Sequence, residues 1–148
     1  MIPRIMIITA YARIATEKGL GSVAKQTICV DWDGTLVEGK WPEHGDWHEG
    51  AVEFLRIFQE KYHVVISTCR TNIIHPSGDL RDPGSVFFEK QQIRNKLDSE
   101  GLTSVELWDY EVKPYKPYAI AYIDDHAVKY PGRPGSWKAL VERINAYA

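Results

Sequence analysis

Residues 26–36, QTICVDWDGTL, are the part of the chain that decides the predicted fold. The segment begins with a short apolar, strand-forming run and then reaches two carboxylates, Asp31 and Asp33. A run of this kind, without polar alternation, is typical of a parallel strand buried on both faces. Gly34 then permits a tight turn. We therefore expect a buried parallel strand that presents Asp31 at its carboxyl end.

The rest of the chain alternates between strand and helix patterns. Further strands are predicted over 63–68, 105–108 and 118–124, with helices over 51–62, 83–99 and from 136 onward, and loops at 37–50 and 71–81. This alternation indicates an α/β fold with a mostly parallel central sheet and helices on both faces, a three-layer Rossmann-like arrangement. Residues 26–148 form the predicted domain. Residues 1–25 are expected to be an N-terminal extension of uncertain structure.

Composition and charge limit the classes of partner. A chain of 148 residues suits one domain. Its 18 basic and 20 acidic side chains give no basic excess for a nucleic-acid polymer or an anionic membrane, although a short phosphorylated ligand remains compatible. The apolar run at 5–12 is shorter than the ~20 residues of a membrane helix, so no membrane partner is expected. We expect Cys29 and Cys69 to be reduced and buried, which favours a cytoplasmic location.

Polar side chains close three of the predicted strands. Asp31 ends the first strand, Thr68 ends the second, and Asp124 and Asp125 end the last. In open α/β sheets the ligand binds beyond the carboxyl ends of the strands. The sequence therefore predicts that these side chains gather at one edge of the sheet.

These motifs resemble those of the haloacid dehalogenase (HAD) superfamily. DWDGTL at 31–36 resembles its first motif, DxDG[TV], and VVIST at 64–68 resembles its second, an apolar strand ending in Ser or Thr. Lys116 and the sequence IDD at 123–125 resemble the third and fourth motifs, and all four occur in the family's order. The stretch KPYAIAYIDDHAV, which begins at Lys116, is similar to small bacterial and phage members of the family.

The resemblance implies a phosphohydrolase that requires Mg²⁺ and forms an aspartyl-phosphate. By this resemblance Asp31 is the nucleophile and also a metal ligand. Asp33 is the general acid and then the general base, and its backbone carbonyl is a metal ligand. Asp124 completes the metal site, in agreement with the preference of Mg²⁺ for oxygen ligands.

Other site residues are also implied by the resemblance. Thr68 and Lys116 would bind the phosphoryl oxygens, with Lys113 as the competing candidate for the lysine. Asp125 would support the metal site, either through water or by orienting its neighbour. Arg70 either contacts substrate or forms an ion pair at the surface or within the structure.

The expected substrate is a phosphate monoester, either a phosphorylated small molecule or a nucleotide or nucleic-acid end. The windows between the motifs leave no room for a folded cap domain, so the site should be open. A non-catalytic HAD-like phosphate-binding module and a phosphotransferase that uses an acceptor other than water remain alternatives. A signalling receiver domain is disfavoured, because its acidic pair precedes its phosphorylated Asp, Thr and Lys. The sequence does not indicate an oligomeric state.

Overall fold

A computed structural model describes residues 24–39, 41–75, 77–127, 132 and 136–147. The predicted N-terminal extension, residues 1–25, therefore lies outside the described residues except for its last two. Among the described helices, none combines the length and the apolar character that a membrane span requires.

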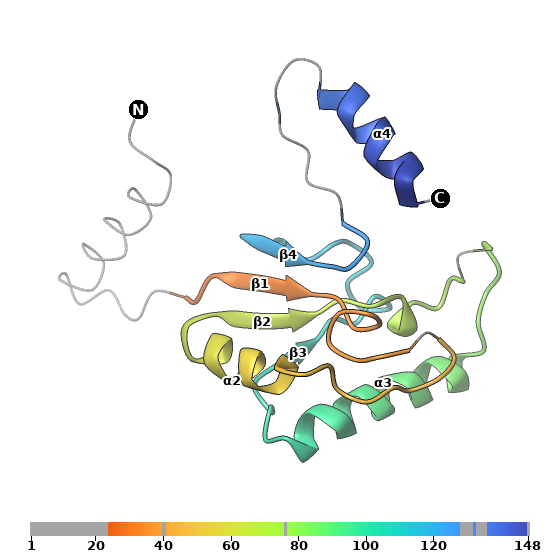
Figure 1. Cartoon of the computed structure of the whole chain (residues 1–148). Coiled ribbons are helices and arrows are strands. Elements are labelled where there is room, and N and C mark those ends of the chain that lie inside the picture. Colours follow the sequence, from red (N-terminus) through yellow and green to blue (C-terminus); the bar gives the residue numbers. More distant parts are fainter. Residues whose placement is uncertain (1–23, 40, 76, 128–131, 133–135, 148) are drawn as a thin grey trace.

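The centre of the fold is a parallel sheet of four strands (Figure 1). The strands are β1 (Thr27–Val30), β2 (His63–Ile66), β3 (Glu106–Leu107) and β4 (Ala121–Ile123), and their order across the sheet is β3-β2-β1-β4. Each of the three neighbouring pairs is parallel. The α/β class and the parallel sheet are thus confirmed, although every strand is shorter than its predicted range. The strand β1 lies between β2 and β4, so its carboxyl end has a polar strand end on each side.

The helices begin and end close to the predicted positions. They are α2 (Ala51–Lys61), α3 (Pro83–Ser99) and α4 (Ser136–Tyr147), with a short 3₁₀ helix η1 (Cys69–Thr71) after β2. The side chain of Asp82 caps α3 by accepting a hydrogen bond from the backbone N–H of Ser85, and Pro83 follows at the first helical position. This local sequence explains why α3 starts where it does.

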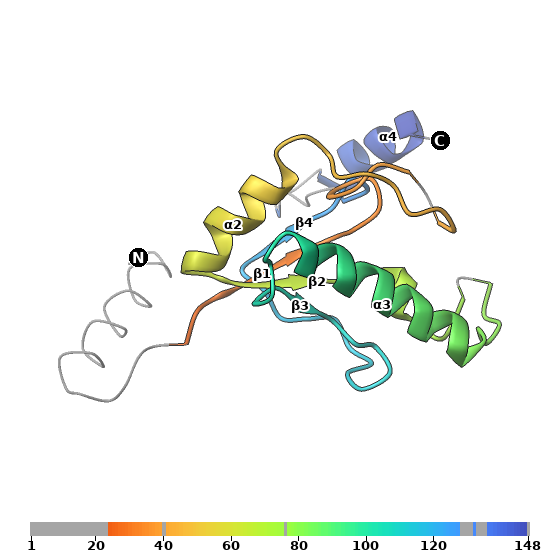
Figure 2. The ribbon, with the colours of Figure 1, turned by 90° about the horizontal axis from the view of Figure 1, so that it is seen from below.

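One face of the sheet carries most of the hydrophobic core. Ile28 and Val30 of β1 lie beside Val64 and Ile66 of β2, and all four belong to the core cluster. Buried residues of α2 and α3 join the same cluster, so these two helices cover one face of the sheet (Figure 2). Burial of this shared apolar surface is the main stabilising contribution that the described fold shows.

The predicted helical layer on the other face of the sheet is not confirmed by the described residues. The backbone of α4 does not come close to another described helix or strand, and α4 lies away from the sheet in Figure 1, although its Ser136 and Leu140 are buried. The connection between β3 and β4 contributes instead, with the Tyr110 hydroxyl 2.6 Å from the Oγ of Ser67. In the described part of the chain, helices therefore cover one face, and the expected second helical layer is not observed.

Candidate active site

Three carboxylates meet where β1 and β4 end. Asp31 follows β1, and Asp124 and Asp125 follow β4 directly. The backbone N–H of Asp31 donates to the carbonyl of Ile123 at 2.8 Å, which extends the pairing of the two strands to this point. One oxygen from each carboxylate can be chosen so that all three lie within 4.8 Å of one another. Parallel pairing of β1 with β4 therefore produces the acidic cluster that the sequence predicted.

The pKa of Asp31 is raised from 3.8 to about 7 in this position. Burial is the largest cause, because it penalises the charged form. The negative charges of Asp124 and Asp125 add to the increase, whereas a hydrogen bond from the backbone N–H of Trp32 acts in the opposite direction. Three carboxylate oxygen donors fit a hard divalent cation such as Mg²⁺.

Asp125 is fixed at the cluster by the turn that follows β1. Its backbone N–H donates to the Thr35 hydroxyl at 3.1 Å. Gly34 adopts a positive φ of 75°, and a Cβ there would collide with the carboxylate of Asp125. Glycine is thus required at this position for both its backbone conformation and its small size.

A cavity of about 420 Å³ opens beside the carboxylates, between the sheet and the connection from β3 to β4. Four of the predicted site residues line it, namely Asp31, Thr68, Lys116 and Asp124. They come from three different strand ends and from the connection before β4. The structure therefore brings together the predicted nucleophile, metal ligand and phosphate-binding side chains.

Thr68 and Lys116 both have polar groups available for an anion in this cavity. Thr68 caps η1, where its Oγ1 accepts a hydrogen bond from the backbone N–H of Arg70 at 3.2 Å and keeps its own proton as a donor. The Nζ of Lys116 lies 3.9 Å from the centroid of the Tyr122 ring. The competing lysine, Lys113, binds Glu106 at 2.9 Å and is not among the residues that line the cavity.

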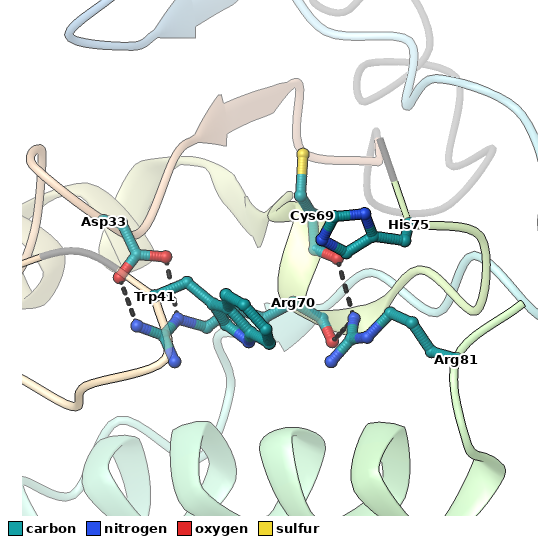
Figure 3. Close-up of a pocket in the computed structure, with 6 residues that line it drawn as sticks. All are labelled: Asp33, Trp41, Cys69, Arg70, His75 and Arg81. Carbon is teal, nitrogen blue, oxygen red and sulfur yellow. Dashed lines mark hydrogen bonds and ion pairs between the residues drawn. The ribbon is translucent and has the colours of Figure 1, made fainter. Parts of the chain in front are cut away.

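Asp33 lies elsewhere, against Arg70 (Figure 3). Both oxygens of its carboxylate accept from the guanidinium, at 2.7 Å from Nε and 2.6 Å from Nη2. Arg70 is only 1% exposed, and its Nη1 also donates to Glu89 at 3.0 Å. Of the two roles considered for Arg70, the structure therefore shows the ion pair within the protein. Asp33, the predicted general acid, lines a cavity different from that of Asp31.

Sequence reasoning missed Glu89 and misjudged one cysteine. Glu89 is 5% exposed on the same side of α3 as the buried residues Val86 and Ile93, so a charge within an apolar stripe was the available signal. Cys29 is buried as expected, but Cys69 is exposed. The prediction for Cys69 was wrong because β2 ends at Ile66 and the chain has already turned into η1.

Comparisons with known proteins do not assign the chain to a family. No protein-family model matches it, and no curated protein matches it. A solved structure of a conserved protein from Bacteroides thetaiotaomicron is similar, with 26% identity and a TM-score of 0.46, over 84% of this chain and 93% of that chain. At this TM-score the similarity leaves family and function open, so the site is interpreted from its own residues.

Proposed function

We propose that the chain is a Mg²⁺-dependent phosphohydrolase of the HAD type, without a cap domain, that hydrolyses phosphate monoesters through an aspartyl-phosphate on Asp31. The observation that supports this proposal best is the cavity shared by Asp31, Thr68, Lys116 and Asp124. Phosphoryl transfer requires little chemistry from the protein other than positioning and charge neutralisation. A nucleophilic carboxylate, a hydroxyl donor and an ammonium group around one space supply these requirements. The proposal includes a second helical layer on the other face of the sheet, as the HAD fold would have.

The metal site of this proposal consists of Asp31, Asp124 and Asp125, with the backbone carbonyl of Asp33 as a further ligand. The fit rests on the donor set, which consists of three carboxylates and therefore offers only oxygen atoms. When bound, Mg²⁺ would neutralise negative charge on the ester and on the carboxylates. It would also keep Asp31 ionised, which the nucleophile needs.

In the first step a carboxylate oxygen of Asp31 forms a bond to phosphorus. The bond from phosphorus to the ester oxygen breaks, and the leaving alcohol keeps that electron pair and receives a proton from Asp33, which must leave Arg70 and be protonated before this step. Thr68 donates a hydrogen bond to a phosphoryl oxygen, and Lys116 stabilises the charge that increases there. In the second step Asp33 accepts a proton from water, whose oxygen attacks phosphorus and releases phosphate and the free Asp31 carboxylate.

One contact supports a second candidate function. The carboxylate of Asp33 is held by Arg70, so the proton donor must leave this ion pair before it can act. A domain in which Asp33 never leaves this ion pair would bind a phosphate group without cleaving its ester. This second candidate is a non-catalytic phosphate-binding module built on the same cavity. A phosphotransferase would follow the first step above, with an acceptor other than water in the second.

Phosphate release from para-nitrophenyl phosphate tests the proposal. We expect activity that requires Mg²⁺ and is abolished by EDTA, with a loss of at least about 10³-fold in Asp31→Asn, because the nucleophile is removed. Asp46→Asn serves as the matched control, since Asp46 is an exposed carboxylate that lines neither cavity. Equal activity in Asp31→Asn and wild type would contradict the proposal. Binding of phosphate by the wild type without ester hydrolysis would favour the non-catalytic module. Transfer of the phosphoryl group from para-nitrophenyl phosphate to an added alcohol would favour the phosphotransferase.

A further inference from the structure

The fold has a second cavity, of about 120 Å³, whose lining residues are shown in Figure 3. Trp41, His75 and Arg81 line it, together with Cys69, Asp33 and Arg70. Cys69 also lines the cavity of Asp31, so the two spaces adjoin at this side chain. None of the proposed catalytic steps uses Trp41, His75 or Arg81. This second space therefore requires its own explanation.

Arg81, which lines the cavity, has an unused hydrogen-bond donor. Its Nη1 donates to the carbonyls of Cys69, Arg70 and Asn72, at 3.2, 2.8 and 2.8 Å. Its Nη2 is buried and has no hydrogen-bond partner within the part of the chain that the structure describes. A buried donor without a partner is unfavourable by about 1–3 kcal/mol, so an acceptor is expected beside it. The side chain is held in place by its other nitrogen and cannot turn away without losing those bonds.

Aromatic side chains form another part of the wall. The rings of Trp41 and His75 lie with their centroids 5.9 Å apart, and the guanidinium carbon of Arg81 is 5.9 Å from the centroid of the Trp41 ring. The indole of Trp41 is 48% exposed, so its surface is available to a ligand. Planar ring systems stack on such surfaces, and an aromatic wall with a single fixed donor suits a flat heterocycle that carries an acceptor.

The charges in the second cavity argue against a second phosphate group. The guanidinium of Arg70 is already neutralised by Asp33 and Glu89. The guanidinium of Arg81 has no carboxylate partner among the described residues and would attract an anion, but a dianionic ligand here would also lie beside the carboxylate of Asp33 and against the indole of Trp41. Carbonyl and ring nitrogen acceptors of a neutral heterocycle do not meet this repulsion.

We propose that this cavity binds the nucleobase of a nucleoside monophosphate whose phosphate group occupies the cavity of Asp31. The inference rests on the proposed function and names its substrate class. The sugar would pass Cys69, the residue that both cavities share. A free mononucleotide is favoured over a nucleic-acid polymer, because the chain has 18 basic against 20 acidic side chains and no excess positive charge to follow a phosphate backbone.

Steady-state kinetics with two substrates test the inference. Adenosine 5′-monophosphate and ribose 5-phosphate carry the same phosphate ester, but only the first carries a base. We expect Trp41→Ala to raise KM for the nucleotide by about 5- to 100-fold, the range that base stacking on an aromatic side chain supports, and to leave KM for ribose 5-phosphate unchanged. Trp41→Phe should restore most of the affinity. Phe87→Ala is the matched control, since Phe87 is 63% exposed on α3 and lines neither cavity.

Binding of adenosine, measured by calorimetry, separates this inference from the proposed function. Adenosine has no phosphate, so its binding does not depend on catalysis. Binding to wild type and to Asp31→Asn, with loss in Trp41→Ala, would support the base site even if no ester were hydrolysed. Absence of adenosine binding, or equal effects of Trp41→Ala on both phosphate esters, would overturn the inference while phosphatase activity could still stand. A higher kcat/KM for a 3′-phosphorylated oligonucleotide than for adenosine 5′-monophosphate would overturn the choice of a free mononucleotide.

Discussion

Asp31 and Asp33 are two residues apart, yet their carboxylates have opposite electrostatic surroundings. Asp33 lies against the buried guanidinium of Arg70, which contacts both of its carboxylate oxygens. Asp31 lies beside two further carboxylates, and its pKa is raised to about 7. One carboxylate receives its compensating charge from within the fold. The other lies among like charges, and we propose that a cation from solution binds there.

Removal of the internal cation should have the largest effect on stability. We expect Arg70→Met to lower the free energy of unfolding by about 3–5 kcal/mol, because Asp33 loses its cation and the buried Glu89 keeps only His44, 2.9 Å away. The measurement is urea denaturation of wild type and variant. Arg56→Met is the control, since the exposed ion pair of Arg56 with Glu100 should contribute less than about 1 kcal/mol. Equal losses of unfolding free energy in the two variants would show that the buried ion pairs of Arg70 stabilise the fold no more than an exposed ion pair does.

Addition of the external cation should have the next largest effect. Mg²⁺ at about 100 times its Kd should stabilise the wild type by about 2.7 kcal/mol, and the effect should be lost in Asp124→Asn. Thermal unfolding at pH 8, with and without Mg²⁺, measures this difference. Glu60→Gln is the matched control, since Glu60 is an exposed carboxylate outside the cluster. Equal stabilisation of all three proteins by Mg²⁺ would remove the cluster from consideration as the cation site.

The smallest of these effects concerns pH in the metal-free protein. The pKa of Asp31 is higher in the folded protein, about 7, than its ordinary value of 3.8, so the folded state binds this proton more tightly than the unfolded state. The resulting stabilisation is complete below pH 3.8 and is lost as the pH rises through about 7.

Asp31→Asn removes this loss of stability. At pH 8 in EDTA we expect the variant to be more stable than wild type by about 1–2 kcal/mol, a value reduced to allow for the partial exposure of the carboxylate. At pH 4 the two proteins should be nearly equal. Thermal unfolding at both pH values provides the comparison, and a variant that is less stable than wild type at pH 8 would contradict it.

The sequence predicted the carboxylate cluster for a simple geometric reason. Parallel strands that are neighbours in a sheet place their carboxyl ends together, so Asp31 and Asp124 had to meet once β1 and β4 were adjacent. The ion pairs of Arg70 with Asp33 and Glu89 could not be found in this way. They depend on how the turn after β1 directs one side chain, and on Glu89 of α3, far along the chain.

The same limit explains the other differences between prediction and structure. Short apolar runs predicted each strand but not its last residue, and this error placed Cys69 in the core. The aromatic and basic residues of the second cavity, Trp41, His75 and Arg81, come from loops without a periodic pattern. Their meeting depends on tertiary contacts that no local sequence signal reports.

The most direct test of the account is the identity of the residue that carries the phosphoryl group. We propose to mix the protein with Mg²⁺ and a phosphate monoester, to quench the reaction in acid, and to analyse its peptides by mass spectrometry. The account predicts one added phosphoryl group on Asp31 in wild type and none in Asp31→Asn. A phosphoryl group on Asp33, or phosphate release at full rate from Asp31→Asn, would contradict the account.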